Sequence, residues 1–401
     1  MWRGAKRRQA LFWPRATRAP GNGVVAPGGA CLRSECAQRG RPVDPWRGQR
    51  RIAQGEAVPC VKPVLARALR KTPLLHLDAP RRGRVRRPGL KLEENGLTGS
   101  VKDRSAVGLL QALHDERPLT PGTVVVESTS GNLGPALARL LPSIDCVFLA
   151  VVDLKTPHAT RTVLTERGAR AIVVGEADGQ GGYLLSRLRR VRELCDRTPG
   201  YRWPNQYENR ASPDIHRRTT GPEITEQAGP EPGAVYVPVS TGGALAGISA
   251  HLRRHRPDVA AVAVDVHGSP AVTGSAGRRL LQGIGAGRPS AFLKGPHGYG
   301  RSVHVDGIEA IAVCPIPAED MGLVPGGSSG CAVCALLSDL ENGRVDDRLA
   351  VCLAADDGGE YRDTLYCDDW ATEQGVVKEI TAAVEQLRRE GLFFDRKHLE
   401  H

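Results

Sequence analysis

Residues 123–141 read TVVVESTSGNLGPALARLL, and this stretch indicates the class of fold. A run of apolar β-branched residues is followed by a short turn of Ser, Thr, Gly and Asn, and then by a helical pattern of Leu and Ala. A strand that passes through a tight turn into a helix is the repeating unit of α/β proteins. An α/β protein should repeat this unit along the rest of the chain.

The unit recurs from about residue 71 onward, where short apolar strands alternate with helical patterns. Near-continuous apolar strands of this kind predict open, mostly parallel twisted sheets covered by helices on both faces, which is an α/β fold. Strands are predicted over residues 89–93, 123–129, 145–152, 169–175, 234–240, 260–266 and 349–355. Helices are predicted over residues 103–115, 132–141, 157–168, 182–196, 213–228, 243–255 and 328–341.

The net charge of +11 is concentrated near the N-terminus. Residues 1–51 hold 12 Lys and Arg against Glu35 and Asp44, whereas the remaining chain holds 43 basic and 42 acidic residues. Because the body of the protein is nearly neutral, no nucleic-acid partner is expected for it. Residues 1–60 are predicted to be a basic, disordered extension; a transit peptide and an extension without function are the alternatives.

Other bulk features exclude several classes of protein. No run of 18 apolar residues occurs, so no membrane partner is expected. The ten cysteines are scattered, and the pattern suits a reducing, cytoplasmic environment. Cys331 and Cys334 have the CxxC spacing but lie in a helical apolar pattern, so no metal site is predicted.

Three turns that precede helices are rich in Gly, Ser and Thr: ESTSGNLG (127–134), STGGALAG (240–247) and PGGSSG (325–330). In open α/β sheets, ligands bind at the carboxyl ends of strands, where such turns gather. Helix N-termini there present free backbone N–H groups to anions. Several turns of this kind indicate a ligand with more than one negative group.

Each turn has a functional and a plain interpretation. The turn at 240–247 either holds a phosphate or is an ordinary glycine-rich turn. The turn at 128–134 either binds a carboxylate or uses one hydroxyl to cap a helix. Lys102, in TGSVKDR (98–104), is either a surface lysine or an amine that holds an aldehyde cofactor; burial and a helix N-terminus would lower its pKa and favour the neutral nucleophile.

Six motifs together decide among these alternatives: KLEENGLTGSVKDR, ESTSGNLGPALA, NQYENRASPDIHRRTTGPEI, STGGALAG, LQGIGAG and GGSSG. Their order and spacing over residues 70–370 resemble the cysteine synthase family of fold-type II pyridoxal-phosphate (PLP) enzymes. The resemblance implies two open sheets with PLP between two lobes, a homodimer, and a catalytic region over 61–400. Within that region a small lobe over about 103–215 is expected to be inserted in the large lobe.

The resemblance also implies roles for individual residues. Lys102 would form the Schiff base with PLP, Asn132 would contact its phenolic oxygen, and Ser328 would face its pyridine nitrogen. A neutral hydroxyl there implies an unprotonated ring nitrogen, which suits β-elimination. The phosphate loop would be Ser240, Thr241, Gly242, Gly243 and Ala244, and the substrate carboxylate would be held by Ser128, Thr129, Ser130, Gly131 and Gln206.

Two positions depart from the family pattern. Gly96 stands where the family usually has proline, and Ala244 stands where a hydroxyl often helps to hold the phosphate. The second departure weakens the predicted phosphate loop slightly.

Further stretches, including GGYLLSRLRRVREL, WPNQYEN and GGEYRDTLYCDDW, resemble the branch that makes N-(2-amino-2-carboxyethyl)-L-glutamate. That branch implies β-replacement through an aminoacrylate, with O-phospho-L-serine and L-glutamate as substrates, and supplies 2,3-diaminopropionate for siderophores and antibiotics. Such substrates carry several negative groups, so Arg288, Tyr183 and Arg187 are candidate partners for them. For Arg187 the favoured alternative is a solvated helix face.

Rival functions stay open at this point. The nearest is a cysteine synthase that uses sulfide with O-acetylserine or O-phosphoserine. Cystathionine β-synthase is less expected, because no regulatory domain pair follows residue 370 and no histidine precedes His76. A non-catalytic binding protein and a nucleic-acid binder through residues 1–51 are the other classes.

Overall fold

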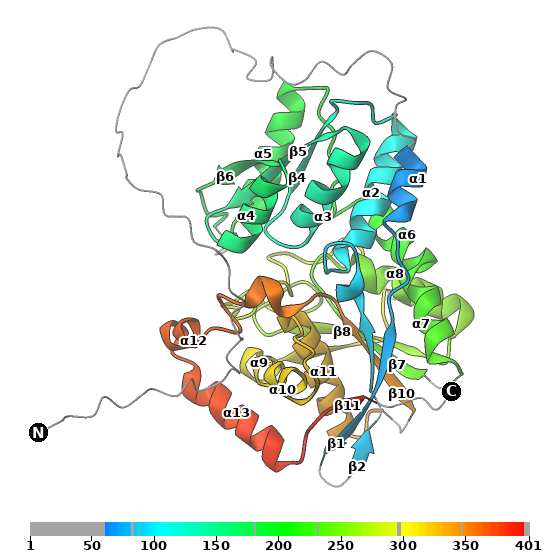
Figure 1. Cartoon of the computed structure of the whole chain (residues 1–401), viewed down its shortest axis with the longest axis vertical. Helices are drawn as coiled ribbons and strands as arrows, with labels where there is room; N and C mark the ends of the chain where they lie inside the picture. The colour runs from blue at the N-terminus through cyan, green and yellow to red at the C-terminus, as the bar shows by residue number, and fades with distance from the viewer. Residues whose placement is uncertain are drawn as a thin grey trace, which may run out of the picture. The chain divides into compact units, whose positions relative to one another are not determined.

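The computed structural model describes residues 61–81, 84–86, 88–179, 182–230, 232–294, 298–345 and 348–396. The predicted N-terminal extension, residues 1–60, lies outside the described residues. The predicted strands and helices form two β-sheets with helices packed around them (Figure 1).

The larger sheet has a parallel centre and an antiparallel edge. β1 pairs antiparallel with β3, whereas β3, β10, β7, β8 and β9 all run parallel. In spatial order the strands are β11 (Asp395–Arg396), β1 (Leu74–Arg81), β3 (Pro88–Leu92), β10 (Leu349–Ala354), β7 (Pro232–Pro238), β8 (Ala260–Val266) and β9 (Arg301–Val305), and β2 (Arg84–Arg86) pairs with β1.

The smaller sheet is parallel throughout and has the order β4 (Val124–Ser128), β5 (Val147–Asp153) and β6 (Arg170–Val174). Figure 1 shows α3, α4 and α5 around these strands. β5, in the middle, is buried along almost its whole length, whereas β6 at the edge alternates between half-buried and exposed residues. The apolar runs of the sequence thus form sheet centres, as parallel pairing requires.

The helices cover both faces of the larger sheet because successive strand residues point to opposite sides. On β7, Ala234 and Tyr236 pack into the core that contains α9 and α11, whereas Val235 and Val237 pack into the core that contains α7 and α8. The helices are α1 (Val61–Arg67), α2 (Lys102–Glu116), α3 (Leu133–Leu140), α4 (His158–Glu166), α5 (Leu184–Arg197), α6 (Ala211–Arg218), α7 (Thr220–Ala228), α8 (Gly243–His255), α9 (Gly307–Val313), α10 (Pro315–Met321), α11 (Gly327–Glu341), α12 (Asp368–Gln374) and α13 (Val377–Arg389).

The predicted α/β fold is confirmed, with local differences. The helix predicted over 213–228 is two helices, α6 and α7, because the backbone at Thr219 leaves the helical region (φ −126°, ψ −74°). β1 and β9 have no counterpart among the predicted strands. The limits of the small lobe, about 103–215, stay a prediction.

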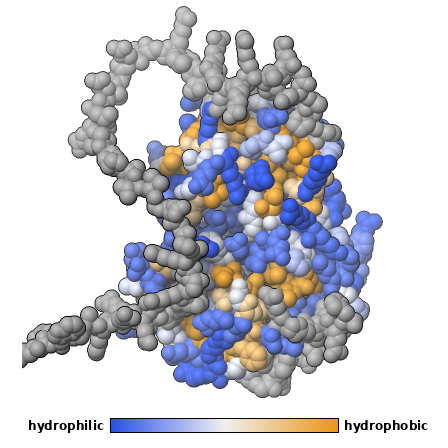
Figure 2. Space-filling model, in the orientation of Figure 1, coloured by the Kyte–Doolittle hydropathy of each residue, from blue (hydrophilic) through white to orange (hydrophobic). Residues whose placement is uncertain are grey.

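The surface is mixed in character. Figure 2 shows hydrophobic patches between hydrophilic side chains on the face viewed, and Leu154 and Val173 are among the exposed large hydrophobic residues. In the described part of the chain, no helix combines the length and hydropathy needed to cross a bilayer. Nor do three His, Cys, Asp or Glu side chains come together there as a set of metal ligands.

Candidate active site

The carboxyl ends of strands from the larger sheet lead into loops that line one pocket. The chain runs from β7 into the 240–244 loop, from β10 to Asp356, and from β3 toward Lys102. The pocket encloses about 470 Å³, open solvent included. All the residues predicted to contact the cofactor line it: Lys102, Asn132, Ser240, Thr241, Gly242, Gly243, Ala244 and Ser328. The structure thus brings them together, and their roles toward a cofactor stay predictions.

The backbone before α2 fixes where Lys102 lies. The N–H of Val101 donates to the carbonyl oxygen of Ala355 at 2.8 Å, and Ser100 forms an antiparallel bridge with Asp356. Helix α2 then begins at Lys102, whose own N–H donates to Ser100 Oγ at 3.2 Å. The start of the helix is therefore attached to the chain that leaves β10.

The side-chain amine of Lys102 loses its proton more readily than that of an exposed lysine. Burial lowers the pKa of Lys102 to about 8, and the nearby Asp356 carboxylate acts in the opposite direction. Among the residues that the structure describes, none forms a hydrogen bond or ion pair with this amine. An amine with a lowered pKa and no partner is prepared to act as a nucleophile or a base.

Asp356 is the acidic residue of the pocket, and the sequence analysis did not single it out. Its side chain is 4% exposed. Oδ1 accepts a hydrogen bond from Ser328 Oγ at 3.0 Å, and Oδ2 accepts from Asn132 Nδ2 at 2.7 Å and from the Tyr361 hydroxyl at 2.6 Å. Two of the three donors, Asn132 and Ser328, are residues predicted to contact the cofactor.

The glycine-rich loop leads directly into α8. Gly242, the N-cap of α8, has a φ of +89°, and a side chain there would collide with the Ser290 hydroxyl. Ser290 Oγ in turn donates to the carbonyl oxygen of Thr241 at 2.6 Å and holds the loop. The first N–H groups of a helix have no partner within it, so this helix end can bind an anion.

The lining of this pocket fits the cofactor that the sequence resemblance implies. A phosphate can be bound by the N-terminus of α8, an aldehyde can react with the free amine of Lys102, and the Ser328 hydroxyl offers a polar contact on the side of Asp356. PLP carries a phosphate, an aldehyde and a ring nitrogen, so each of its polar parts has a partner of suitable chemistry.

The turn after β4 was predicted to hold a carboxylate. Thr129 does the work of a helix cap here: its Oγ1 accepts from the N–H of Gly134 at 3.0 Å and donates to the carbonyl oxygen of Gly131 at 3.0 Å. Beyond Gly131, a side chain would meet open space, so packing does not require a glycine there. Ser128, Thr129, Ser130 and Gly131 lie outside the pocket lining, but they lead directly into Asn132, which belongs to it.

Gln206 is fixed against the same turn. It is 6% exposed, its Nε2 donates to the carbonyl oxygen of Ser128 at 2.9 Å, and its N–H donates to Glu127 Oε2 at 3.1 Å. Glu127 is fully buried, and burial raises its pKa to about 7 despite the hydrogen bonds that it accepts. Gln206 therefore holds the predicted carboxylate turn through its backbone.

Arg187 corrects the favoured interpretation of a solvated helix face. It is 5% exposed, and its Nε lies 3.1 Å from Oδ2 of Asp153. Its Nη1 is buried and makes no hydrogen bond among the described residues. The phenol of Tyr207, whose pKa is raised by burial, interacts with Arg187 electrostatically. The RLRRVR pattern suggested a solvated helix face, but α5 turns this one arginine toward β5.

The other two predicted anion partners have different surroundings. Arg288 Nη2 pairs with Glu208 Oε1 at 3.1 Å, and its guanidinium lies 5.4 Å from the centre of the Tyr207 ring. Tyr183 precedes α5, and Lys155 Nζ lies over its ring at 5.8 Å. Neither residue lines the pocket, so a contact with substrate stays a prediction for both.

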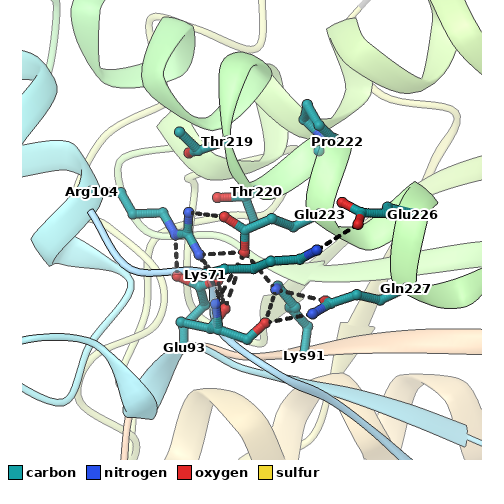
Figure 3. Close-up of polar contacts among 12 residues, drawn as sticks. Lys71, Lys91, Glu93, Arg104, Thr219, Thr220, Pro222, Glu223, Glu226 and Gln227 are labelled. Carbon is teal, nitrogen blue, oxygen red and sulfur yellow. Dashed lines mark hydrogen bonds and ion pairs between the residues drawn. The ribbon is translucent and has the colours of Figure 1, made fainter. Parts of the chain in front are cut away.

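A second group of charges contacts α2, and Figure 3 shows its polar contacts. Arg104, two residues after Lys102, donates from Nε to Glu93 Oε2 and from Nη1 to Glu223 Oε1, both at 2.7 Å. Lys91, which is fully buried, donates to Glu223 Oε2 at 2.7 Å and to Gln227 Oε1 at 2.9 Å. This ionic network joins β3, α2 and α7.

Gly96, a departure from the family pattern, has a local cause. A side chain there would collide with the carboxylate of Asp103, which accepts hydrogen bonds from the N–H and the hydroxyl of Thr98. The loop before Lys102 is thus closed by Asp103 rather than by a proline.

Comparisons with known proteins agree with this geometry. The family described as "Pyridoxal-phosphate dependent enzyme" matches residues 65–356. An N-(2-amino-2-carboxyethyl)-L-glutamate synthase from Ralstonia nicotianae is 36% identical over 299 residues, which cover 75% of this chain and 88% of the relative.

Solved structures give the same result for the fold. A hydrogen sulfide-producing enzyme from Fusobacterium nucleatum, crystallised with an α-aminoacrylate intermediate, is 23% identical with a TM-score of 0.71 and covers 85% of this chain and 98% of its own. An O-ureido-L-serine synthase is 26% identical with a TM-score of 0.68 and covers 77% and 98%. Because the family match spans most of the described residues and includes the pocket, the chain belongs to the pyridoxal-phosphate dependent enzymes.

Proposed function

We propose that this enzyme joins the β-carbon of O-phospho-L-serine to the amino group of L-glutamate, giving N-(2-amino-2-carboxyethyl)-L-glutamate. The observation that carries the proposal is the 36% identity, over 299 residues, to the synthase named for that product. In the structure, the buried guanidinium of Arg187 supports the same proposal.

Arg187 is a candidate partner for an anionic substrate. A buried guanidinium with an unused donor costs stability unless something satisfies it. Asp153 offsets its charge but leaves Nη1 without a hydrogen bond among the described residues. A carboxylate or phosphate oxygen suits this donor, and both O-phosphoserine and glutamate carry such groups. Arg187 does not belong to the pocket lining, so its contact with substrate is part of the proposal.

The cofactor and Lys102 would have different roles in β-replacement. PLP, when bound, supplies an aldehyde that links covalently to an amine and a ring that withdraws electrons from it. Lys102 would hold PLP, would take the proton from Cα of phosphoserine, and would return a proton to Cα once the glutamate nitrogen has bonded to Cβ. Phosphate leaves with the electrons of its C–O bond, and the amine of glutamate loses one proton as it adds.

Substrate orientation is proposed for the turn after β4. Ser128, Thr129, Ser130, Gly131 and Gln206 would hold the α-carboxylate of phosphoserine. The open space beyond Gly131 and the rigid support from Gln206 are compatible with a ligand at this turn. Tyr183 and Arg288 are kept as candidates for the outer carboxylate of glutamate.

We also propose the wider setting that the resemblance implies. The enzyme would act as a homodimer in the cytoplasm, and its product would supply 2,3-diaminopropionate for siderophore or antibiotic synthesis. Free thiols of the described cysteines, such as Cys146 and Cys352, agree with a reducing compartment.

The direct test uses the full chain loaded with PLP. O-phosphoserine and glutamate should yield equal amounts of phosphate and of the adduct, measured by a phosphate assay and by mass spectrometry. Sulfide is supplied in a parallel reaction, alone and in competition with glutamate. If sulfide is the preferred nucleophile with either O-phosphoserine or O-acetylserine, the protein is a cysteine synthase and the proposal is wrong.

A variant of Arg187 tests the charge argument. Arg187→Lys keeps the positive charge opposite Asp153 but loses the planar set of donors. KM for the anionic substrate that Arg187 contacts, O-phosphoserine or glutamate, should therefore rise about tenfold. The matched control is Arg189→Lys on the same helix, where the guanidinium is exposed and pairs loosely with Glu176. Equal KM values for both variants would remove Arg187 from the site.

A further inference from the structure

A ring of hydrogen bonds surrounds Ser128 at the end of β4. The Glu127 carboxylate accepts from the N–H of Ser128 at 2.8 Å through Oε1, and from the N–H of Gln206 at 3.1 Å through Oε2. Gln206 Nε2 in turn donates to the carbonyl oxygen of Ser128 at 2.9 Å. The N–H and the carbonyl group of Ser128 are therefore both held by side chains, and the turn that follows starts from a fixed residue.

The segment that carries Gln206 is also attached to β4 by its backbone. Hydrogen bonds of 2.8 and 2.9 Å join the backbone of Arg202 to this strand. Beyond them, Glu127 Oε1 accepts a further hydrogen bond from Trp203 Nε1 at 3.1 Å. One carboxylate thus extends the contact between the segment and β4 as far as the turn at 128–131.

The three partners of Glu127 require an acceptor. All of them are N–H groups, and an ionised carboxylate only accepts hydrogen bonds. An amide or a protonated carboxyl of the same shape carries hydrogen on one of its two terminal atoms, so at least one of the three bonds would be lost or weakened. Glu127 is fully buried, so water does not replace a lost bond. The ring is complete only while Glu127 is ionised.

The surroundings of Glu127 leave its ionisation balanced near neutral pH. Burial raises the pKa of Glu127 to about 7, and its three hydrogen bonds and the Arg187 guanidinium act against this rise. Cys195 and Tyr207 also interact with Glu127 electrostatically, but burial raises the pKa of each, so both are neutral near pH 7. Arg187 is therefore the charged group that faces this carboxylate.

We propose that Glu127 is a positioning residue: as a carboxylate it holds the turn at 128–131 in the conformation that binds the α-carboxylate of an amino-acid substrate, and its protonation weakens that binding. The inference rests on the part of the proposed function that assigns this turn to the α-carboxylate. Both residues that Glu127 holds through their N–H groups, Ser128 and Gln206, belong to that assigned site. A loosened ring would therefore loosen the site, although Glu127 itself touches no substrate.

The test titrates the PLP-loaded full chain with L-alanine, which has an α-carboxylate and no leaving group, and follows the absorbance of the cofactor. L-alaninol, in which a hydroxymethyl group replaces the carboxylate, is titrated in parallel. At pH 8, Glu127→Gln should raise the dissociation constant for L-alanine about tenfold, which corresponds to one lost hydrogen bond to a charged group. The dissociation constant for L-alaninol should stay the same.

The pH dependence separates positioning from support of the fold. Glu127→Gln resembles the protonated acid, so its effect on L-alanine at pH 8 should shrink toward none at pH 6, where the wild-type carboxyl is itself protonated. The amine of L-alanine titrates equally with both proteins and cancels in the ratio of their dissociation constants. A ratio that is constant between these pH values, or an equal loss for L-alaninol, would overturn the inference.

The matched control is Glu116→Gln. Glu116 Oε2 accepts from Arg202 Nη2 at 3.2 Å, on the segment that leads to Gln206, but its side chain is exposed. Removing this exposed charge should leave the dissociation constants for both ligands equal to those of the wild type.

The wild-type protein alone decides the matter if Glu127→Gln does not fold. Its preference for L-alanine over L-alaninol should fall as the pH drops from 8 to 6, and a constant preference would contradict the inference. Neither ligand is phosphoserine or glutamate, so failure to form the glutamate adduct would count against the proposed function and not against Glu127.

Discussion

Two cations on one helix have opposite surroundings. Arg104 donates to Glu93 and Glu223 and has every part of its guanidinium satisfied (Figure 3). Lys102, one half-turn earlier, has an amine without a hydrogen bond among the described residues. Both lie away from solvent to a large extent, so burial alone does not separate them. The difference is whether the fold itself supplies the partners.

The contrast distinguishes structural charges from functional ones. In the ionic network, two cations and two carboxylates balance, and Thr72 and Gln227 complete the hydrogen bonds. At the pocket, an amine with a lowered pKa faces a carboxylate and a free helix end. Proteins keep such unsatisfied groups where a ligand completes them.

The largest effect on turnover should come from removing the amine. Lys102→Ala should lower turnover of O-phosphoserine and glutamate by about 1000-fold or more, because it removes the amine proposed to hold PLP and to move the Cα proton. The free energy of unfolding of the PLP-free protein should stay the same or rise, since a buried amine is removed. Urea denaturation and adduct formation are measured on one preparation; turnover within tenfold of wild type would contradict the comparison.

Removing the guanidinium of Arg104 should instead lower the free energy of unfolding. Arg104→Met leaves the carboxylates of Glu93 and Glu223 buried without it, so the free energy of unfolding should fall by about 3–5 kcal/mol. The matched control, Arg217→Met, breaks an exposed pair with Asp214 at 3.2 Å and should cost less than about 1 kcal/mol. Equal urea midpoints for the two variants would show that the ionic network contributes little.

The pH dependence of the free energy of unfolding should show a third and smaller effect, which arises from Lys102. The pKa of Lys102 is about 8 in the folded protein, against 10.5 as its ordinary value, so between these values the unfolded chain binds more protons. Stability therefore rises with pH across this interval, and the cost of the charged amine is fully present below about pH 8.

Lys102→Met should lack that rise. The measurement is the free energy of unfolding of PLP-free wild type and variant at pH 8 and pH 10, because other groups titrate equally in both and cancel in the difference. A constant difference between the two proteins would mean that burial does not lower this pKa.

The smallest effect is expected at Arg288. Its ion pair with Glu208 joins partly exposed side chains, so Arg288→Ala should lower the free energy of unfolding by less than about 1 kcal/mol. KM for glutamate should change less than in Arg187→Lys. A larger rise in KM for Arg288→Ala would reverse the order of the two arginines as partners of the substrate.

The sequence predicts the parallel strands and their helices because long apolar runs and glycine turns are local signals. It misses β1, which reads LLHLDAPR, and β9, which reads RSVHV, because polar residues interrupt strands near the edges of a sheet. Edge strands need fewer apolar residues, so their pattern is weak.

The same division holds for the site. Lys102 and the loop at 240–244 follow from motifs, and the structure brings them to one pocket. Asp356 sits in a run that reads as a polar loop, and only the approach of α3 and α11 reveals its partners. The interpretation of Arg187 as part of a solvated helix face was wrong, because a local pattern of arginines does not say which one the helix turns inward.

The hydrogen bond from Val101 to Ala355 and the bridge between Ser100 and Asp356 fix the start of α2 relative to the chain that follows β10. The reactive amine and its counter-charge both belong to the framework of the larger sheet, whereas Asn132 arrives from the smaller one. If the smaller sheet shifts when a substrate enters, the separation of lysine and aspartate is preserved while the amide changes its distance. Only the Asn132 amide would then respond to the substrate, and Lys102 would keep its position relative to Asp356.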